Sequence, residues 1–308
     1  MRGRSLLGRS VAALAAGWAA ACGLVYWRTF RRLPRTHRDS RRLTPADFEL
    51  AYEELEVRTA DRLRLLTWLL PGTRHAVVVV SGGYRGHISD VLGIGAALRR
   101  AGFSVVAYGW RGTPGSDAAP HTLGANERRD LIAVLDAVWE RLGPLPIGLL
   151  GYSMGGAVSI SVGAGDPRVR AVCADSAFAD PVNLLEERIR QQLRLPAPVL
   201  ADPVMALMAR RSGARLADFR PVTAVARLAP RPLLLIHGDS DASVPVEHGH
   251  RLYAAAGDPK DLWVLPGVGH VGGYFADRAA YVERVIDFFD RSLGQPAEPR
   301  ASCTQIHS

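Results

Sequence analysis

The sequence predicts an α/β fold in which helices flank a mostly parallel central sheet, and three observations indicate it. Continuous apolar runs such as Val77–Val80 and Pro146–Leu150 have the composition of buried parallel strands. These runs alternate with segments whose apolar residues recur at helical spacing. The chain has 308 residues, 48% of them hydrophobic and 22% charged, so it can bury a substantial core. We expect one large domain over residues 46–294.

The first elements of this domain are two strands, around Tyr52–Arg58 and Leu63–Leu70. Their alternating pattern predicts an antiparallel edge of the sheet. His75–Ser81 follows as a central parallel strand, because its core is β-branched and continuously apolar. Helices are expected at Ser89–Ala101, Leu123–Leu142 and Ala276–Leu293.

A glycine-flanked serine follows the next strand. Gly151–Gly156, with the sequence GYSMGG, comes after Pro146–Leu150 and opens a small-residue segment that is predicted to be helical. A sharp turn from strand to helix lifts a serine hydroxyl above the sheet edge, and glycines two residues before and after let neighbouring chains pass closely. Ser153 is therefore the candidate nucleophile. The motif alone does not identify a nucleophile. The assignment of Ser153 therefore depends on whether the sequence also offers a base and an acid to act with it.

Two later strand-like runs also end in polar residues. Pro232–Ile236 leads into the turn that holds Asp241, and Leu262–Leu265 leads into the loop that holds His270. The loops that follow parallel strands at their carboxyl ends share one edge of the sheet. We therefore expect Ser153, Asp241 and His270 to converge, although they are far apart in sequence.

These features together resemble those of the α/β-hydrolase superfamily, over about residues 50 to 293. Within it, the sequence is similar to serine hydrolases of the prolyl-oligopeptidase type and the monoglyceride-lipase type. Four ordered segments carry the resemblance, namely Gly109–Ser116, Gly151–Gly156, His237–Asp241 and Gly269–His270. It implies an α/β-hydrolase fold with a small helical lid. One departure is Gly82–Gly83 before Tyr84, where the family usually has His-Gly.

The chemistry expected of these residues is ester hydrolysis through an acyl-enzyme. His270 acts as general base and then as general acid, and Asp241 orients the imidazole. The backbone amides of Tyr84 and Met154 are expected to form the oxyanion hole. The predicted substrate is a small carboxylic ester, acyl or lipid-like. No cofactor is expected, and no carboxylate or histidine cluster has the spacing of a metal site.

Alternatives stay open at this point. Asp239 and Asp175 compete with Asp241 for the role of the acid, and Asp241 is favoured because it lies four residues after His237, as in the family turn. The same triad serves peptidases, amidases, thioesterases and acyltransferases. The alternative from another class is a non-catalytic, membrane-bound binding module with a hydrolase-like fold.

A proline-containing segment, about residues 178–228, interrupts the strand pattern where this superfamily usually inserts a lid. Its prolines separate short helical runs such as Asn183–Leu195. The apolar residues of these runs suit either a flexible roof over an acyl chain or plain packing of helices on the sheet. Both interpretations are kept.

Residues 1–45 are predicted to be a transmembrane anchor or a signal, followed by a basic linker. No charged residue occurs from Val11 to Trp27, and a helix of that length reaches ~25 Å. Arginines crowd the far side of this run, which favours an uncleaved anchor with the catalytic domain in the cytoplasm. The alternative is export after cleavage near Ala19–Ala21.

Most of the net positive charge belongs to this N-terminal region. Residues 1–42 contain ten arginines and one aspartate, and the rest of the chain holds 28 basic and 29 acidic residues. A nucleic-acid partner is therefore not expected. Residues 295–308 are predicted to be disordered. The sequence leaves the oligomeric state and the natural substrate open.

Overall fold

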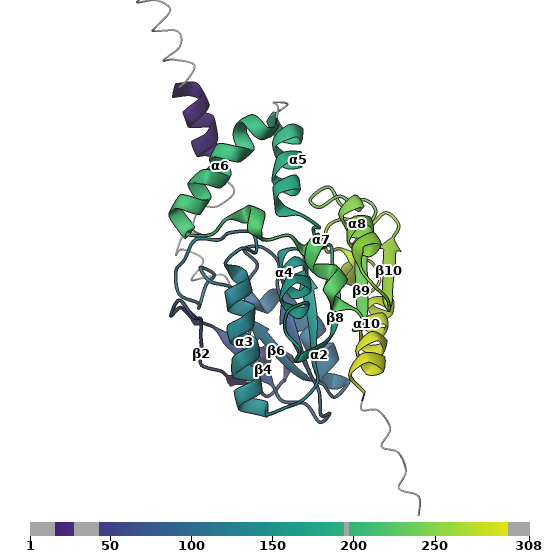
Figure 1. Cartoon of the computed structure of the whole chain (residues 1–308). Coiled ribbons are helices and arrows are strands. Elements are labelled where there is room, and N and C mark those ends of the chain that lie inside the picture. The colour runs from purple at the N-terminus through teal and green to yellow at the C-terminus, as the bar shows by residue number, and fades with distance from the viewer. Residues whose placement is uncertain (1–15, 28–42, 194–196, 295–308) are drawn as a thin grey trace, which may run out of the picture.

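A computed structural model describes residues 16–27, 43–193 and 197–294 of the chain (Figure 1). Its centre is an eight-stranded sheet with the order β1-β4-β6-β5-β7-β8-β9-β10. The pairs β1 with β4 and β4 with β6 are antiparallel, and every pair from β6 to β10 is parallel. The predicted α/β architecture with a mostly parallel sheet is confirmed.

The strands of the large sheet are β1 (Glu53–Glu54), β4 (Thr67–Leu70), β5 (Val77–Ser81), β6 (Ser104–Tyr108), β7 (Ile147–Tyr152), β8 (Val169–Asp175), β9 (Leu233–Gly238) and β10 (Lys260–Leu265). A separate hairpin pairs β2 (Val57–Arg58) with β3 (Arg64–Leu65). The predicted antiparallel edge is present, but it is broken, because the chain leaves the sheet after β1 to form this hairpin and rejoins it at β4.

Helices pack on both faces of the sheet. The buried side chains of α2 (Leu92–Arg100) and α10 (Arg278–Leu293) belong to one core, and those of α3 (Glu127–Leu142), α4 (Met154–Gly163) and α8 (Glu247–Ala255) belong to the other. The three helices expected from the sequence are therefore present, with shorter bounds.

The valine run of β5 lies between these two cores. Val77 and Val79 pack in the core that contains α3 and α4, whereas Val78 and Val80 pack in the core that contains α2 and α10. Successive side chains of a strand point to opposite faces. A strand that is covered on both faces buries every side chain, which explains why Val77–Val80 of β5 is a continuous apolar run.

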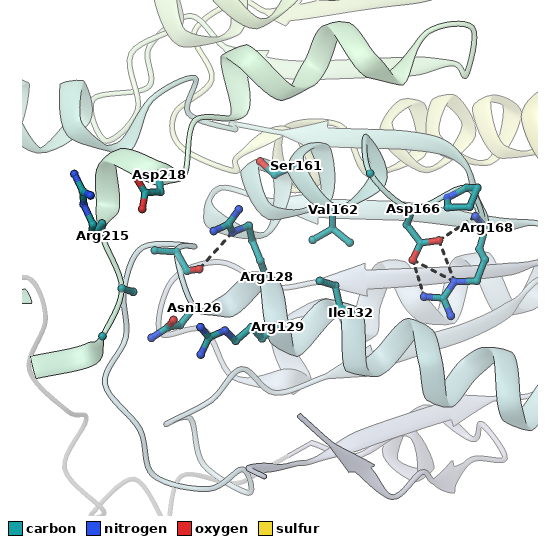
Figure 2. Close-up of a pocket in the computed structure, with 15 residues that line it drawn as sticks. Asn126, Arg128, Arg129, Ile132, Ser161, Val162, Asp166, Arg168, Arg215 and Asp218 are labelled. Atoms are coloured by element: carbon teal, nitrogen blue, oxygen red, sulfur yellow. Dashed lines mark hydrogen bonds and ion pairs between the residues drawn. The ribbon is translucent and has the colours of Figure 1, made fainter. Parts of the chain in front are cut away.

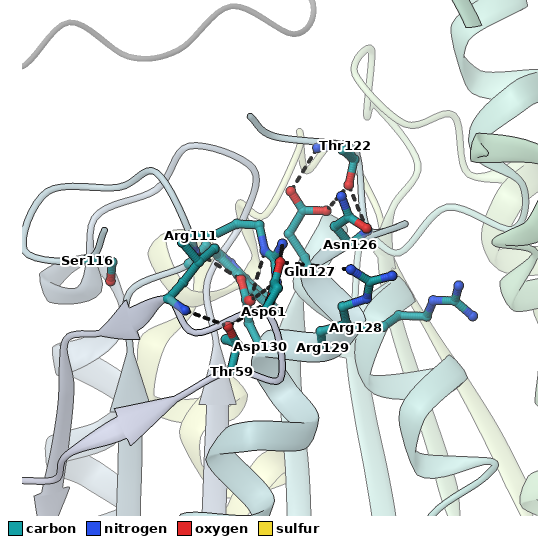
Figure 3. A network of polar contacts seen from close by, with 12 residues as sticks. Thr59, Asp61, Arg111, Ser116, Thr122, Asn126, Glu127, Arg128, Arg129 and Asp130 are labelled. Carbon is teal, nitrogen blue, oxygen red and sulfur yellow. Dashed lines mark hydrogen bonds and ion pairs between the residues drawn. The ribbon is translucent and has the colours of Figure 1, made fainter. Parts of the chain in front are cut away.

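A buried ionic network fixes the loop that follows β6 (Figure 3). The Arg111 side chain donates hydrogen bonds to both carboxylate oxygens of Asp61, at 2.8 and 3.2 Å, and to Oδ1 of Asp130, at 2.9 and 2.7 Å. Its backbone N–H donates to the other Asp130 oxygen at 2.9 Å. The side chains of Arg111 and Asp130 are 2% and 0% exposed. The network joins the β2–β3 hairpin to the first turn of α3.

The loop before α3 is held in a similar way. Glu127, which is fully buried, accepts hydrogen bonds from the Thr122 backbone and hydroxyl at 2.8 and 2.7 Å, and from the Gly124 backbone at 2.9 Å (Figure 3). The neighbouring His121 ring contacts the Tyr84 ring edge-on, with the ring centres 5.4 Å apart. This loop therefore supports the segment that follows β5.

The predicted membrane anchor is wrong. The N-terminal helix of the described chain covers residues 16–27, which is ~18 Å, and no described helix is long and apolar enough to cross a bilayer. The Trp18 indole donates to the Val199 carbonyl at 3.1 Å, and Arg211 lies over the Tyr26 ring at 5.8 Å. These contacts place the helix beside α6 (Ala197–Ser212) (Figure 1).

The predicted membrane partner and membrane-anchored localisation are corrected by the same finding. An uncharged run favours a membrane in a hydropathy argument, but the same apolar residues can pack against another helix of the protein. The remaining parts of the N-terminal prediction, residues 1–15 and 28–42, lie outside the described residues, as does the predicted disordered tail over residues 295–308.

The predicted lid region is helical. It holds α5 (Pro181–Leu193) and α6, which contact each other above the body of the molecule (Figure 1), followed by α7 (Pro221–Ala224) and short 3-10 turns. Leu184 and Leu185 on α5 are buried. The role of this region as a lid, and the domain boundaries, stay predictions.

We predict that Asp130→Ala lowers the free energy of unfolding by ~3–5 kcal/mol, because it leaves the buried Arg111 charge without its main partner. Chemical denaturation measures this value. The control is Glu56→Ala, which breaks the ion pair between Arg58 and Glu56, whose side chains are 59% and 73% exposed. This substitution should lower the free energy of unfolding by less than about 1 kcal/mol. Equal losses in the two variants would show that the buried network does not carry this stability.

Candidate active site

Ser153 lies at the junction of β7 and α4. It follows Tyr152, the last residue of the strand, and precedes Met154, the first residue of the helix. Its backbone has φ 52° and ψ −115°, a conformation that non-glycine residues rarely adopt. The Ser153 N–H donates to the Asp175 carbonyl at 2.8 Å. The neighbouring strand β8 therefore helps to hold the strained turn.

Two glycines make this turn possible. A Cβ atom on Gly151 would lie 2.3 Å from the Gly155 carbonyl oxygen, and one on Gly155 would lie 2.4 Å from the Ser81 carbonyl oxygen. Both contacts are with backbone atoms, which cannot move aside as a flexible side chain can. The spacing of glycine, serine and glycine in the sequence is thus a packing requirement, because α4 starts directly against β5 and β7.

The structure brings the three predicted triad residues together. His270 lies in the loop after β10, with its Nε2 atom 2.9 Å from the Ser153 hydroxyl and its Nδ1 atom 2.6 Å from Oδ2 of Asp241. Asp241 lies in the loop after β9. Since a carboxylate can only accept, His270 donates from Nδ1 to Asp241 and accepts from the serine hydroxyl at Nε2. A continuous line of hydrogen bonds therefore runs from the carboxylate to the hydroxyl.

Asp241 is held by its own loop. Its other oxygen, Oδ1, accepts the backbone N–H groups of Ser243 and Val244, both at 2.8 Å, and the carboxylate has no exposed surface. Burial by itself raises the pKa of this carboxyl. The hydrogen bonds from His270, Val244 and Ser243 outweigh burial and hold the pKa of Asp241 below its usual value. Asp241 is therefore ionised at neutral pH.

The two competing acids are placed elsewhere. Asp239 is exposed, and it accepts the Gly267 N–H at 2.7 Å, which ties its turn to the loop after β10. Asp175 is buried and accepts the Tyr281 hydroxyl at 2.8 Å and the Ser176 hydroxyl at 3.0 Å. Burial raises the pKa of Asp175 to about 6. Neither acid is hydrogen-bonded to His270.

His237 is a neighbour of the site to which the sequence analysis gave no role beyond marking the family turn. Its Nε2 atom donates to the Val244 carbonyl at 2.8 Å and lies 3.6 Å from Oδ2 of Asp241. Burial lowers the pKa of His237, which favours the neutral ring. The sequence places His237 at the carboxyl end of an apolar strand, near the predicted site, but it does not show which way the ring points.

The residues proposed for the oxyanion hole also lie next to Ser153. Tyr84 and Met154 line a narrow cavity of about 30 Å³ together with Ser153, and the other walls are mostly apolar side chains from the segments after β8 and from α5. Gly83 approaches closely as well, since a Cβ atom there would lie 3.8 Å from Cβ of Ser153. The role of the two backbone amides stays a prediction.

A larger cavity of about 660 Å³ is also lined by Ser153. Its walls are mainly aromatic and aliphatic, with few charged groups. The lining residues are Gly83, Tyr84, Gly86, Asp90, Val91, Gly93, Ile94, Tyr152, Ser153, Arg188, Ser243, His270, Val271, Tyr274 and Phe275. Phe275 stands at the rim, with 84% of its surface exposed. This space can hold the bulk of a small organic ligand beside the serine.

A second large cavity is remote from these residues. It measures about 720 Å³ and lies between α3, the end of α4 and the segment after α6, as Figure 2 shows. Arg128, Arg129 and Arg215 line it, and none of Ser153, Asp241 or His270 does. In the described part of the chain, no cluster of three or more His, Cys, Asp or Glu side chains is arranged to hold a metal ion.

Comparisons with known proteins agree with this architecture. The Hydrolase_4 family, described as "Serine aminopeptidase, S33", matches residues 72–218. An uncharacterized protein of Mycobacterium tuberculosis is 30% identical over 258 residues, which cover 80% of this chain and 82% of the relative. The polyketide transferase GrgF of a Penicillium species is 24% identical over 288 residues, which cover 79% of this chain and 98% of that protein.

Among solved structures, the esterase Pf2001 of Pyrococcus furiosus superposes with a TM-score of 0.69 at 22% identity and covers 83% of this chain and 97% of its own. At 22% sequence identity, this structural similarity shows that the two proteins share a fold. Together with the Hydrolase_4 match and the M. tuberculosis relative, it leads to one conclusion: the chain belongs to the α/β-hydrolase superfamily.

Proposed function

We propose that the protein is a serine hydrolase that cleaves small carboxylic esters, acyl or lipid-like, through an acyl-enzyme. The observation that carries this proposal is the line of two hydrogen bonds from Asp241 through His270 to the Ser153 hydroxyl. This arrangement matches the chemical roles of acid, base and nucleophile. The similarity in fold to the P. furiosus esterase supports the choice of esters.

The first half of the reaction forms the acyl-enzyme. His270 accepts the hydroxyl proton at Nε2 while the Ser153 oxygen attacks the ester carbonyl. Asp241, held ionised by its hydrogen bonds, stabilises the imidazolium that forms and keeps the Nδ1 proton in place. His270 then donates its proton to the departing alcohol.

The negative oxygen of the tetrahedral intermediate needs hydrogen-bond donors. We assign this role to the backbone N–H groups of Tyr84 and Met154, because both residues lie beside Ser153 and because Met154 begins α4, where backbone N–H groups are free of helical partners. In the second half, His270 accepts a proton from water as the water oxygen attacks the acyl carbonyl. It then returns the proton to the Ser153 oxygen as the bond between this oxygen and the acyl group breaks and the acid leaves. No step of this mechanism calls for a cofactor.

The lid belongs to the same proposal. We propose that residues 46–294 form the hydrolase domain and that residues 178–228 form its lid, because Leu184 and Leu185 of α5 line the narrow cavity beside Ser153. This position lets α5 limit the size of the group that enters next to the nucleophile. The larger cavity then receives the rest of the substrate.

Acyl transfer to an acceptor other than water is the second candidate. It is favoured by the similarity to a polyketide transferase of a Penicillium species. Cleavage of amides is a further possibility for the same site, because the matched family is described as serine aminopeptidase. Peptidases, amidases, thioesterases and acyltransferases all use such a triad, and the pocket selects among them. A hydrolase-like binding module without activity is the remaining alternative.

We predict that Ser153→Ala lowers the kcat/KM for short 4-nitrophenyl esters by about 10⁴-fold or more and abolishes labelling by a fluorophosphonate probe, because the nucleophile is lost. The matched control is Ser161→Ala, because this serine of α4 lines the remote cavity and its loss should leave both activity and labelling unchanged. Turnover that survives Ser153→Ala would refute the proposed nucleophile, and an inactive native protein would favour the binding module.

We further predict that Asp241→Asn lowers kcat by roughly 10⁴-fold, because an amide favours the wrong tautomer of His270. Asp239→Asn should change kcat less than about threefold, since Asp239 only ties two loops together. Steady-state kinetics on the same ester compares the variants, with Asp175→Asn included as the third candidate acid. A larger loss in Asp239→Asn or Asp175→Asn than in Asp241→Asn would contradict the assignment.

A further inference from the structure

Arg188 stands at the meeting point of the two cavities that contain Ser153. It projects from α5, the first helix of the lid region, and lines both the narrow cavity and the larger one. It is close enough to Tyr84 and Asp241 to interact with both electrostatically. A permanent positive charge therefore lies beside the proposed nucleophile.

Arg188 forms no close ion pair with an acidic side chain among the described residues. Its guanidinium donates one hydrogen bond, from Nη2 to the Ser243 carbonyl at 3.3 Å, and none of the ion pairs found in the described chain includes it. The nearby acids are engaged elsewhere, because Asp241 pairs with His270 and Glu187 pairs with His248 at 3.1 Å. Arg188, which lines both cavities, thus keeps donors that no hydrogen bond with a described residue occupies.

The rest of the cavity wall limits what this cation can bind. Asp90 is the other strongly charged residue of the larger cavity, and its carboxylate already accepts the His87 N–H at 2.8 Å. A single guanidinium in mostly apolar walls suits one negative charge, and the carboxylate of Asp90 disfavours a more highly charged group such as a phosphate dianion. The guanidinium also has the planar fork that matches a carboxylate.

We propose that Arg188 binds a carboxylate of the substrate, so that the preferred substrates are esters that carry a second, ionised carboxyl group. This inference rests on the proposed function, because it describes the substrate of the same site. Since Arg188 borders both cavities, the carboxylate belongs either to the acyl part or to the alcohol part of the ester. The competing explanation is that Arg188 only ties α5 to the Ser243 loop.

The test uses two pairs of esters that differ in charge. For the acyl part, 4-nitrophenyl hydrogen adipate is compared with 4-nitrophenyl hexanoate, and for the alcohol part, 4-acetoxybenzoate is compared with its methyl ester. Rates are corrected for uncatalysed hydrolysis. We expect the native protein to favour the anionic member of one pair in kcat/KM by about tenfold or more, and the pair that shows the preference identifies the part that carries the carboxylate.

The variants are Arg188→Gln, Arg188→Lys and the control Arg190→Gln. Arg188→Gln should lower the ratio of the anionic to the neutral rate by about tenfold, and Arg188→Lys should keep part of the preference because it keeps the charge. Arg190 lies two residues further along α5 and pairs with Glu186 at 3.2 Å, so Arg190→Gln should leave the ratio unchanged. A shift of the lid lowers both rates of a pair together and cancels in the ratio.

Two results would overturn the inference. One is a native protein that hydrolyses the neutral esters through Ser153 without preferring either anionic ester, and the other is a preference that survives Arg188→Gln. Both leave the proposed function standing. If no ester is turned over, calorimetric titration of the Ser153→Ala protein with monomethyl adipate and with dimethyl adipate still decides the matter, because only the former should bind and Arg188→Gln should abolish that binding.

Discussion

The close approach of α4 to β5 and β7 is the constraint on which the rest of the site depends. The gap is so narrow that Gly151 and Gly155 leave no room for a Cβ atom, and Ser153 between them is forced to a positive φ. This turn aims the hydroxyl outward at the end of the sheet, where the loops after β9 and β10 deliver Asp241 and His270. The mostly parallel order of the strands makes these distant segments neighbours.

The central sheet and the convergence of the three candidate residues at its edge could be predicted from the sequence, because general rules of strand burial and sheet topology determine them. Two-sided burial makes a strand such as Val77–Val80 continuously apolar, and residues after the ends of parallel strands meet at one edge. These two rules place Ser153, Asp241 and His270 together without any knowledge of side-chain directions. The choice of Asp241 over Asp239 rested on the resemblance to the family turn, in which the acid lies four residues after the histidine, and in the structure Asp241 is the acid that contacts His270.

Other features depend on contacts that a sequence pattern does not contain. The apolar run that ends at Trp27 was interpreted as a membrane anchor, yet its described helix packs on α6 through Trp18 and Tyr26, and an uncharged run does not show which apolar partner covers it. Arg188 gave no signal either, because its place beside Ser153 follows from how α5 lies over the sheet. The proposed preference for anionic esters is therefore an inference from tertiary structure alone.

The central claim, that Ser153 carries the acyl group during turnover, is tested most directly by mass spectrometry of the enzyme quenched during hydrolysis of a 4-nitrophenyl ester. We expect a mass increase equal to one acyl group, located by fragmentation on the peptide that contains Ser153. An acyl group found on another residue, or rapid turnover with no acylated protein even when deacylation is slowed by His270→Ala, would contradict it.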